Sequence, residues 1–245
     1  MDAVVISERG IRPTMEDAQF LDVNFDNRGL IFGGIYDGHG GEYAAKYAAD
    51  RIHKIFLEKL RLGMTPGQAF NSSYESVSGE LYDQESGTTA ADFLIQGHKI
   101  FTANVGDTRI LLVKRKSFIQ LTTDHRLSSI KEEDRIKKLG ASISYPYIIR
   151  EGHGLMITRS LGDHNFETDG VVWTPSLNEY IVSSDDMMLI SASDGLWNFM
   201  SNGEIASIVL EHQTLRSLLE NLVKEVLVNR SGTDNLTVIA VSLLP

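Results

Sequence analysis

The spacing of apolar side chains predicts strands along most of the chain and helices in two separate pairs. Short apolar or alternating runs predict strands. The first three strands are expected at Ala3 to Ser7, Gln19 to Asn24 and Gly29 to Tyr36. Apolar residues three and four positions apart then predict a helix over Glu42 to Leu62. Thr65 and Pro66 open a second helix as a capping residue followed by proline.

The rest of the chain is again rich in strands, and its second pair of helices lies near the end. Strands are expected at 90–96, 99–104, 109–113, 117–121, 171–174, 178–183, 187–192 and 235–242. We expect a charged, exposed helix over Ser128 to Leu139 and an irregular surface flap over Ala141 to Leu155. The last two helices are predicted after the capping box of Ser201 and Glu204 and over Leu215 to Val228.

This order of elements predicts the fold class. A parallel doubly wound sheet requires regular alternation of strands and helices, and this chain does not show that alternation. The pattern favours an α+β fold, with two sheets packed face to face and helices on their outer faces. Repeats, low-complexity segments and linker-like composition are absent from the sequence, so we expect one domain over residues 1–245.

Acidic residues recur at the ends of the predicted strands. Asp37 and Asp194 each end an apolar run and are followed by glycine, and His39 lies among the glycines after Asp37. The other acids at such places are Asp107, Asp234, and the pair Glu16 and Asp17, which follows Arg12. Carboxylate and carbonyl oxygens select hard divalent cations such as Mg²⁺ and Mn²⁺. The pattern therefore indicates a metal site built from several carboxylates.

Each of these residues also has a plain structural alternative. The aspartates could cap turns, because Asp-Gly is ordinary turn chemistry. Glu16 and Asp17 could form an exposed acidic loop, and Arg12 could pair with them in a surface ion pair. His39 could be a turn residue bonded to backbone.

Composition narrows the range of functions. The formal net charge of −10 disfavours nucleic-acid binding by a broad basic surface and is compatible with an acidic, cation-requiring site. The chain contains no cysteine, which excludes disulfides, zinc-thiolate sites and a cysteine nucleophile. Neither a signal peptide nor a membrane span is evident. We expect a cytoplasmic protein, with the nucleus as the alternative compartment and no membrane partner.

Eight motifs in the chain resemble, in order, those of the metal-dependent protein serine/threonine phosphatases of the 2C type. They cover almost the whole chain, and the ordered set is far more specific than any one motif. The segments are Arg12 to Asp17, Asp37 to Gly41, Ser86 to Ala90, Asn104 to Arg109, Thr123 to Arg126, Thr158 to Asp163, Ser193 to Trp197 and Asp234 to Val238. The resemblance implies a four-layer α-β-β-α sandwich, with two antiparallel sheets flanked by helix pairs.

The resemblance also implies a role for each candidate residue. The expected ligands of two Mg²⁺ or Mn²⁺ ions are Glu16, Asp37, the Gly38 carbonyl, Asp194 and Asp234. Asp17 corresponds to a residue that orients metal-bound water, Arg12 to the phosphate-binding arginine and His39 to the proposed general acid. Asp107, with Asp194, corresponds to a third and weaker metal position.

Asn198 departs from the family pattern, which usually has an aspartate there. A neutral amide keeps a carbonyl oxygen but loses a charge, so we expect a third ion to bind more weakly or not at all. Leu127, where the family commonly has proline, is expected to change only loop stiffness, and the flap does not match the family closely.

The predicted function is hydrolysis of phosphoserine and phosphothreonine in proteins. Two ions would activate a bridging water and neutralise the phosphoryl oxygens, so no phosphoenzyme is expected. Arg12 would hold two phosphate oxygens, and His39 would protonate the leaving oxygen. The expected partners are phosphorylated proteins, and the expected state is a monomer. The alternatives are a pseudophosphatase that binds without turnover and a hydrolase of small phosphoesters.

Overall fold

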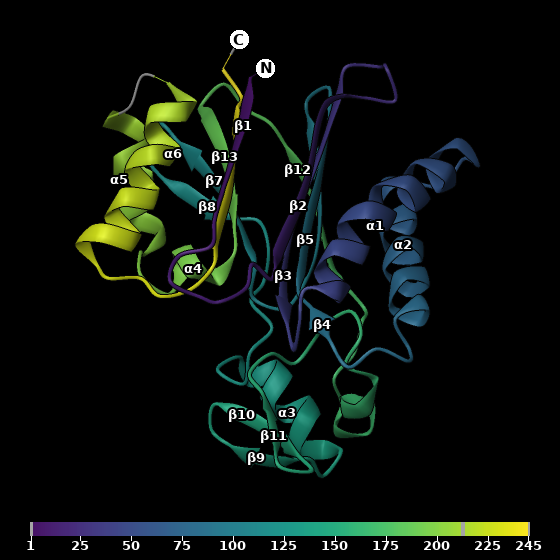
Figure 1. Ribbon diagram of the computed structural model, residues 1–245. Coiled ribbons are helices and arrows are strands. Elements are labelled where there is room, and N and C mark those ends of the chain that lie inside the picture. Colours follow the sequence, from purple (N-terminus) through teal and green to yellow (C-terminus); the bar gives the residue numbers. More distant parts are fainter. Residues whose placement is uncertain (1, 212–213, 245) are drawn as a thin grey trace.

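We describe the protein from a computed structural model that covers residues 2–211 and 214–244. Two antiparallel sheets face each other in the middle of the molecule, and a pair of helices covers the outer face of each (Figure 1). The predicted α+β sandwich of four layers is therefore confirmed. In the part of the chain described here, none of the helices has the length and apolar character needed to cross a membrane.

The first sheet contains the strands nearest both chain ends, in the order β1-β14-β13-β7-β8. Their bounds are β1 Ala3–Glu8, β14 Leu236–Ser242, β13 Asp186–Ala192, β7 Arg109–Lys114 and β8 Phe118–Gln120. Helices α5 (Asn202–Glu211) and α6 (Leu215–Lys224) cover its outer face (Figure 1). The single turn α4 (Asp194–Trp197) follows β13.

The second sheet is built from strands in the order β12-β6-β5-β3-β2, and the short β4 pairs with the end of β3. The bounds are β2 Asp17–Phe25, β3 Leu30–His39, β4 Gly87–Thr88, β5 Ala90–Gln96, β6 Lys99–Val105 and β12 Ser176–Ile181. Helices α1 (Tyr43–Arg61) and α2 (Pro66–Glu80) cover its outer face (Figure 1). Thr65 and Gln68 form a capping box at the start of α2, as the Thr-Pro pair indicates.

Alternation along β3 shows how one strand serves two cores. Phe32 and Tyr36 are fully buried against α1 and α2. Ile31 and Ile35 point the opposite way and pack between the two sheets. Successive side chains of a strand face opposite sides, so a strand buried on both sides is apolar at nearly every position.

The expectation of an irregular flap over Ala141 to Leu155 is wrong. This segment forms a small sheet of β9 (Ser142–Ser144), β10 (Tyr147–Arg150) and β11 (His153–Leu155). Helix α3 (Ile130–Lys138) and the 3₁₀ helix η1 (His164–Asp169) lie beside it (Figure 1). The sheet packs on these helices through a buried cluster that includes Ile148, Leu155, Ile136 and Phe166. Strands of three or four residues are too short to show a period in sequence.

Three further expectations need correction. Val171 to Thr174 is not a strand, because it makes only one isolated bridge, between Val172 and Arg159. Helix α3 is not wholly exposed, since it buries Glu132 and Ile136. The sequence predicts that the last helix reaches Val228, but its α-helical part ends at Lys224 and a π-helical turn follows over Glu225–Asn229.

Candidate active site

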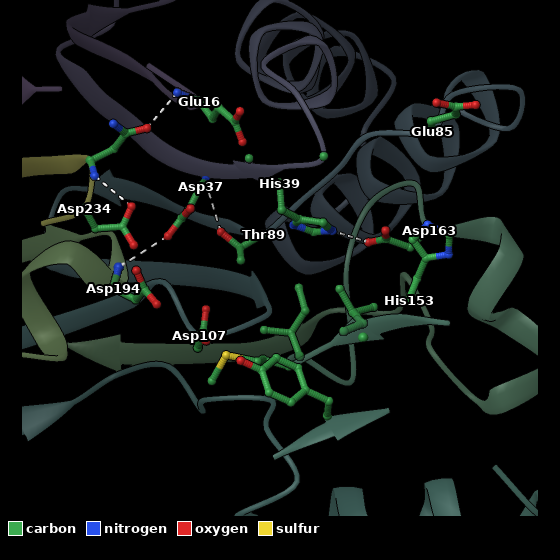
Figure 2. A pocket seen from close by; sticks show the side chains of 18 of the residues that line it. Glu16, Asp37, His39, Glu85, Thr89, Asp107, His153, Asp163, Asp194 and Asp234 are labelled. Atoms are coloured by element: carbon green, nitrogen blue, oxygen red, sulfur yellow. Dashed lines mark hydrogen bonds and ion pairs between the residues drawn. The ribbon is translucent and has the colours of Figure 1, made fainter. Parts of the chain in front are cut away.

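The ends of both large sheets meet at one cavity of about 560 Å³ (Figure 2). The lining includes eight of the nine predicted site residues: Arg12, Glu16, Asp37, Gly38, His39, Asp107, Asp194 and Asp234. Asp17 is not among the lining residues. Tyr147 and the segment His153 to Ile157, from the small β9–β11 sheet and the residues after it, form another part of the wall.

Strand pairing brings the acids together from distant parts of the chain. Asp37 lies opposite Asp17 in the β2–β3 register, and the Gly38 N–H donates to the Glu16 carbonyl at 3.2 Å. In the other sheet, Ala192 at the end of β13 lies opposite both Arg109 on β7 and Val238 on β14. The residues just outside these strand ends therefore lie together at one end of the sheet. They include Asp107, Asp194 and Asp234.

The backbone around Asp37 is held closely on both sides. Its N–H donates to the Thr89 hydroxyl at 3.1 Å, and its carbonyl accepts from the Thr89 N–H at 2.9 Å. The Asp37 carboxylate accepts from the Asp194 N–H at 3.4 Å, a contact drawn between the two sheets in Figure 2. A Cβ at Gly38 would lie 2.6 Å from the Glu16 carbonyl oxygen, so only glycine fits there.

Burial and crowding raise the pKa of several of these carboxyl groups. Burial is the main cause for Asp37, whose pKa lies well above its usual value, and the Asp17 and Asp194 charges add to it. Burial, with Asp107 nearby, raises the pKa of Asp194 to about 7. Negative charges gathered in a partly dry site favour a bound cation, and an all-oxygen donor set suits Mg²⁺ or Mn²⁺.

Two arginines neutralise part of this charge. The Arg12 guanidinium donates to the Asp234 carboxylate at 2.7 Å, so Arg12 does pair with an acid, but not with Glu16 or Asp17. Arg126 donates to Asp107 and, at 3.2 Å, to Asp194. Across residues 2–211 and 214–244, no three carboxylate or imidazole groups converge closely enough to hold one ion as the side chains lie here.

Asp17 lies behind the cavity, in the body of the protein. Asp17 is only 6% exposed, and its carboxylate accepts a hydrogen bond from the Ser193 hydroxyl at 2.8 Å. Burial raises the pKa of Asp17 to about 6, against the lowering effect of the Ser193 and Thr237 hydroxyls. Its position beside Asp37 suits a group that acts through its neighbours.

Asp163 is a site residue to which the sequence analysis gave no role. Its buried carboxylate lies 2.7 Å from His39 Nε2 (Figure 2). Burial lowers the pKa of His39, but the Asp163 charge and hydrogen bond outweigh it, and the net pKa is raised. Asp163 ends the Thr158 to Asp163 motif, so the sequence carried a signal without indicating its partner. The pair thus favours the protonated form of the His39 imidazole, and a protonated imidazole is a proton donor.

Residues 1–235 match the family model described as Protein phosphatase 2C. The chain belongs to the protein phosphatase 2C family. It is 31% identical to the rice (Oryza sativa subsp. japonica) "Probable protein phosphatase 2C 27", over 96% of this chain and 73% of that protein. It is 32% identical to the rice "Probable protein phosphatase 2C 7", over 97% of this chain and 64% of that one.

Solved structures share the fold. A serine-threonine phosphatase 2C from Toxoplasma gondii superposes with a TM-score of 0.87 at 20% identity, covering 98% of this chain and 94% of that one. A bacterial serine phosphatase superposes with a TM-score of 0.75 at 20% identity, covering 99% and 98% of the two chains. By family membership the protein is a protein serine/threonine phosphatase, as the motifs predict.

Proposed function

We propose that this phosphatase hydrolyses phosphoserine and phosphothreonine in proteins by direct attack of water, with Mg²⁺ or Mn²⁺ as cofactor and no phosphoenzyme. The observation that carries the proposal is the convergence of Glu16, Asp37, Asp194 and Asp234 on one cavity that Arg12 and His39 also line. The absence of cysteine agrees with a mechanism that has no thiol nucleophile.

The donor atoms are of the kind that hard divalent ions prefer. Glu16, Asp37, the Gly38 carbonyl, Asp194 and Asp234 supply only oxygen, and burial among like charges raises the pKa of Asp37 and Asp194. When bound, such ions lower the pKa of water and neutralise phosphoryl oxygens. The chain therefore supplies the acidic frame that such ions need.

The other residues bind the substrate and move a proton. The Arg12 side chain is 54% exposed at the rim of the cavity. Its planar guanidinium can release Asp234 and bind two phosphate oxygens instead. Asp163 raises the pKa of His39 and so favours its charged form, which can protonate the departing serine or threonine oxygen. We further propose that the protein acts as a cytoplasmic monomer on phosphorylated proteins.

The test is turnover of para-nitrophenyl phosphate by the purified chain. We expect activity with Mn²⁺, none after chelation, and a loss of about 10²–10³-fold in Asp194→Asn, as for other single charge-stabilising groups. The matched control is Asp83→Asn, because Asp83 is exposed and lies outside the cavity.

The outcomes separate the rival functions. Turnover that persists without any divalent ion would contradict the two-ion mechanism. Tight Mn²⁺ binding without turnover of any phosphoester would instead favour the pseudophosphatase, which keeps the fold and binds partners.

A further inference from the structure

The guanidinium of Arg126 lies between two acids of the cavity. Its Nε donates to Asp107 Oδ2, and one terminal nitrogen donates to Asp194 Oδ2 at 3.2 Å. Both terminal nitrogens also lie 3.3–3.4 Å from the amide oxygen of Asn198. One cation thus contacts oxygens from the β6–β7 turn, from the start of α4 and from the residue after α4.

The backbone on either side of Arg126 is anchored. Arg126 forms an isolated bridge with Ile157, and its carbonyl accepts from the Ser129 N–H at 3.0 Å. The preceding His125 N–H donates to the Gly106 carbonyl at 2.9 Å, directly before Asp107. The Arg126 side chain is only 25% exposed. These contacts hold the side chain at the acids, unlike a surface arginine that is free to move into solvent.

Asn198 complements this arrangement. Its amide nitrogen donates to Asp194 Oδ2 at 2.9 Å, while its amide oxygen accepts from Arg126. The opposite orientation of the amide would aim its NH₂ at the guanidinium, so the network defines the assignment. An aspartate here could not donate to Asp194 and would add a third negative charge beside a single positive one.

We propose that the Arg126 guanidinium replaces a third divalent ion between Asp107 and Asp194, so that this chain binds no more than two ions. This inference rests on the proposed metal-dependent function. Arg126 and Asn198 together satisfy the acceptors that a third ion would otherwise bind, and the bonds from the guanidinium to the two carboxylates are charge-assisted. An incoming third ion would first have to displace Arg126 from Asp107 and Asp194.

The experiment counts bound ions and does not depend on activity. Free Mn²⁺ gives a sharp electron paramagnetic resonance signal that is lost on binding, so a titration of the full chain yields stoichiometry and affinity. We expect at most two ions on the wild type. Arg126→Met removes the charge but keeps much of the side-chain stem. The double variant Arg126→Met with Asn198→Asp should bind one further ion. Its affinity for that ion should be about ten-fold higher than that of the wild type for any extra ion, a difference of about 1.4 kcal/mol.

Two further variants control the comparison. Arg51→Met removes an arginine that pairs with Glu80 on exposed helix surfaces, and it should leave the ion count unchanged. Arg126→Lys keeps one positive charge and should not gain an ion. Circular dichroism shows whether each variant folds, and if Arg126→Met does not fold, the smaller Arg126→Gln change with Asn198→Asp takes its place.

The two proposals fail differently. A folded double variant that gains no ion over the wild type overturns the role of Arg126, as does a wild type that binds three ions tightly. A wild type that binds no ion contradicts the two-ion function. A gain in the double variant supports Arg126 as the group that excludes an ion when Asn198→Asp alone gains none, and an equal gain in Asn198→Asp alone overturns that role.

Discussion

His39 and Asp163 form a pair whose geometry is set by close packing. A Cβ at Gly87 would lie 2.1 Å from Asp163 Oδ2 and 2.5 Å from His39 Nε2, so both side chains lie directly against the Gly87 backbone. Asp163 itself has a left-handed conformation, with φ of 53°, at the start of η1. Asparagine and aspartate tolerate this region better than most residues. The pair is thus held in one orientation at the cavity.

We expect His39→Ala to reveal its role through the leaving group. On a phosphoserine peptide kcat/KM should fall by about 10²–10⁴-fold, the usual worth of a general acid. On para-nitrophenyl phosphate the loss should be much smaller, because that leaving group departs without a proton. His98→Ala, on an exposed turn, is the matched control. Equal losses on both substrates would exclude the general-acid role.

Asp163 is expected to act through His39. Asp163→Asn should therefore show the same preference for the aryl ester, with a smaller loss on the peptide than His39→Ala. In the double variant the two losses should not add, since groups that work as one unit are non-additive. Additive losses would show that Asp163 acts independently of the histidine.

At the scale of elements, Glu132 on α3 binds the segment that follows β11 through hydrogen bonds and ion pairs. Its buried carboxylate accepts from Arg159 at 2.6 Å, Arg135 at 2.6 Å and the Thr158 hydroxyl at 2.9 Å. Ile157, directly before Thr158 in this segment, lines the cavity. Burial raises the pKa of Glu132, but the two arginines outweigh it and lower the pKa to about 2.

We expect Glu132→Gln to lower the free energy of unfolding by about 3 kcal/mol, the low end of the range for breaking a buried ion pair, because it leaves two partly buried arginines without their counter-charge. The folded pKa lies below the ordinary value of 4.5, so this stabilisation is present above pH 4.5 and is lost as pH falls toward 2. Urea unfolding at several pH values measures the difference. Glu133→Gln, one position away in a partly exposed pair with Lys137, is the control. A difference independent of pH would contradict the role of the Glu132 charge.

At the scale of the whole molecule, the cavity lies where the two sheets meet. Asp37 belongs to the β2–β3 side, whereas Asp194 and Asp234 border β13 and β14. An apolar core that includes Ile35, Leu112 and Ile239 fills the space between the two sheets. Ions held by acids from both sheets would join two halves that are otherwise linked by this core.

Mn²⁺ should therefore raise the melting temperature of the protein. A ligand at a hundred times its Kd stabilises the folded state by about 2.7 kcal/mol. Differential scanning calorimetry with Mn²⁺ and with chelator measures the shift, which Asp37→Asn should reduce and Asp83→Asn should not. An unchanged melting temperature at saturating Mn²⁺ would contradict ion binding across the two sheets.

Local patterns were sufficient for the layers and for most of the acids at the site. Periodicity located α1 and β14 to within a few residues, and the capping residues marked the start of α2 and α5. These features depend on neighbours within one or two turns or strand lengths, and a sequence displays such neighbours directly. The ordered motifs identified eight of the residues that line the cavity, because each motif is itself a short segment.

Contacts between distant segments required the tertiary structure. His39 and Asp163 are 124 positions apart, and Arg126 meets Asp194 across 68. The small β9–β11 sheet likewise depends on packing against α3 and η1, because its strands are too short for propensity to decide. The chain thus specifies which side chains it has and how each segment folds locally. Strand register and packing bring distant segments together, and only then is it decided which charges neutralise one another at the cavity.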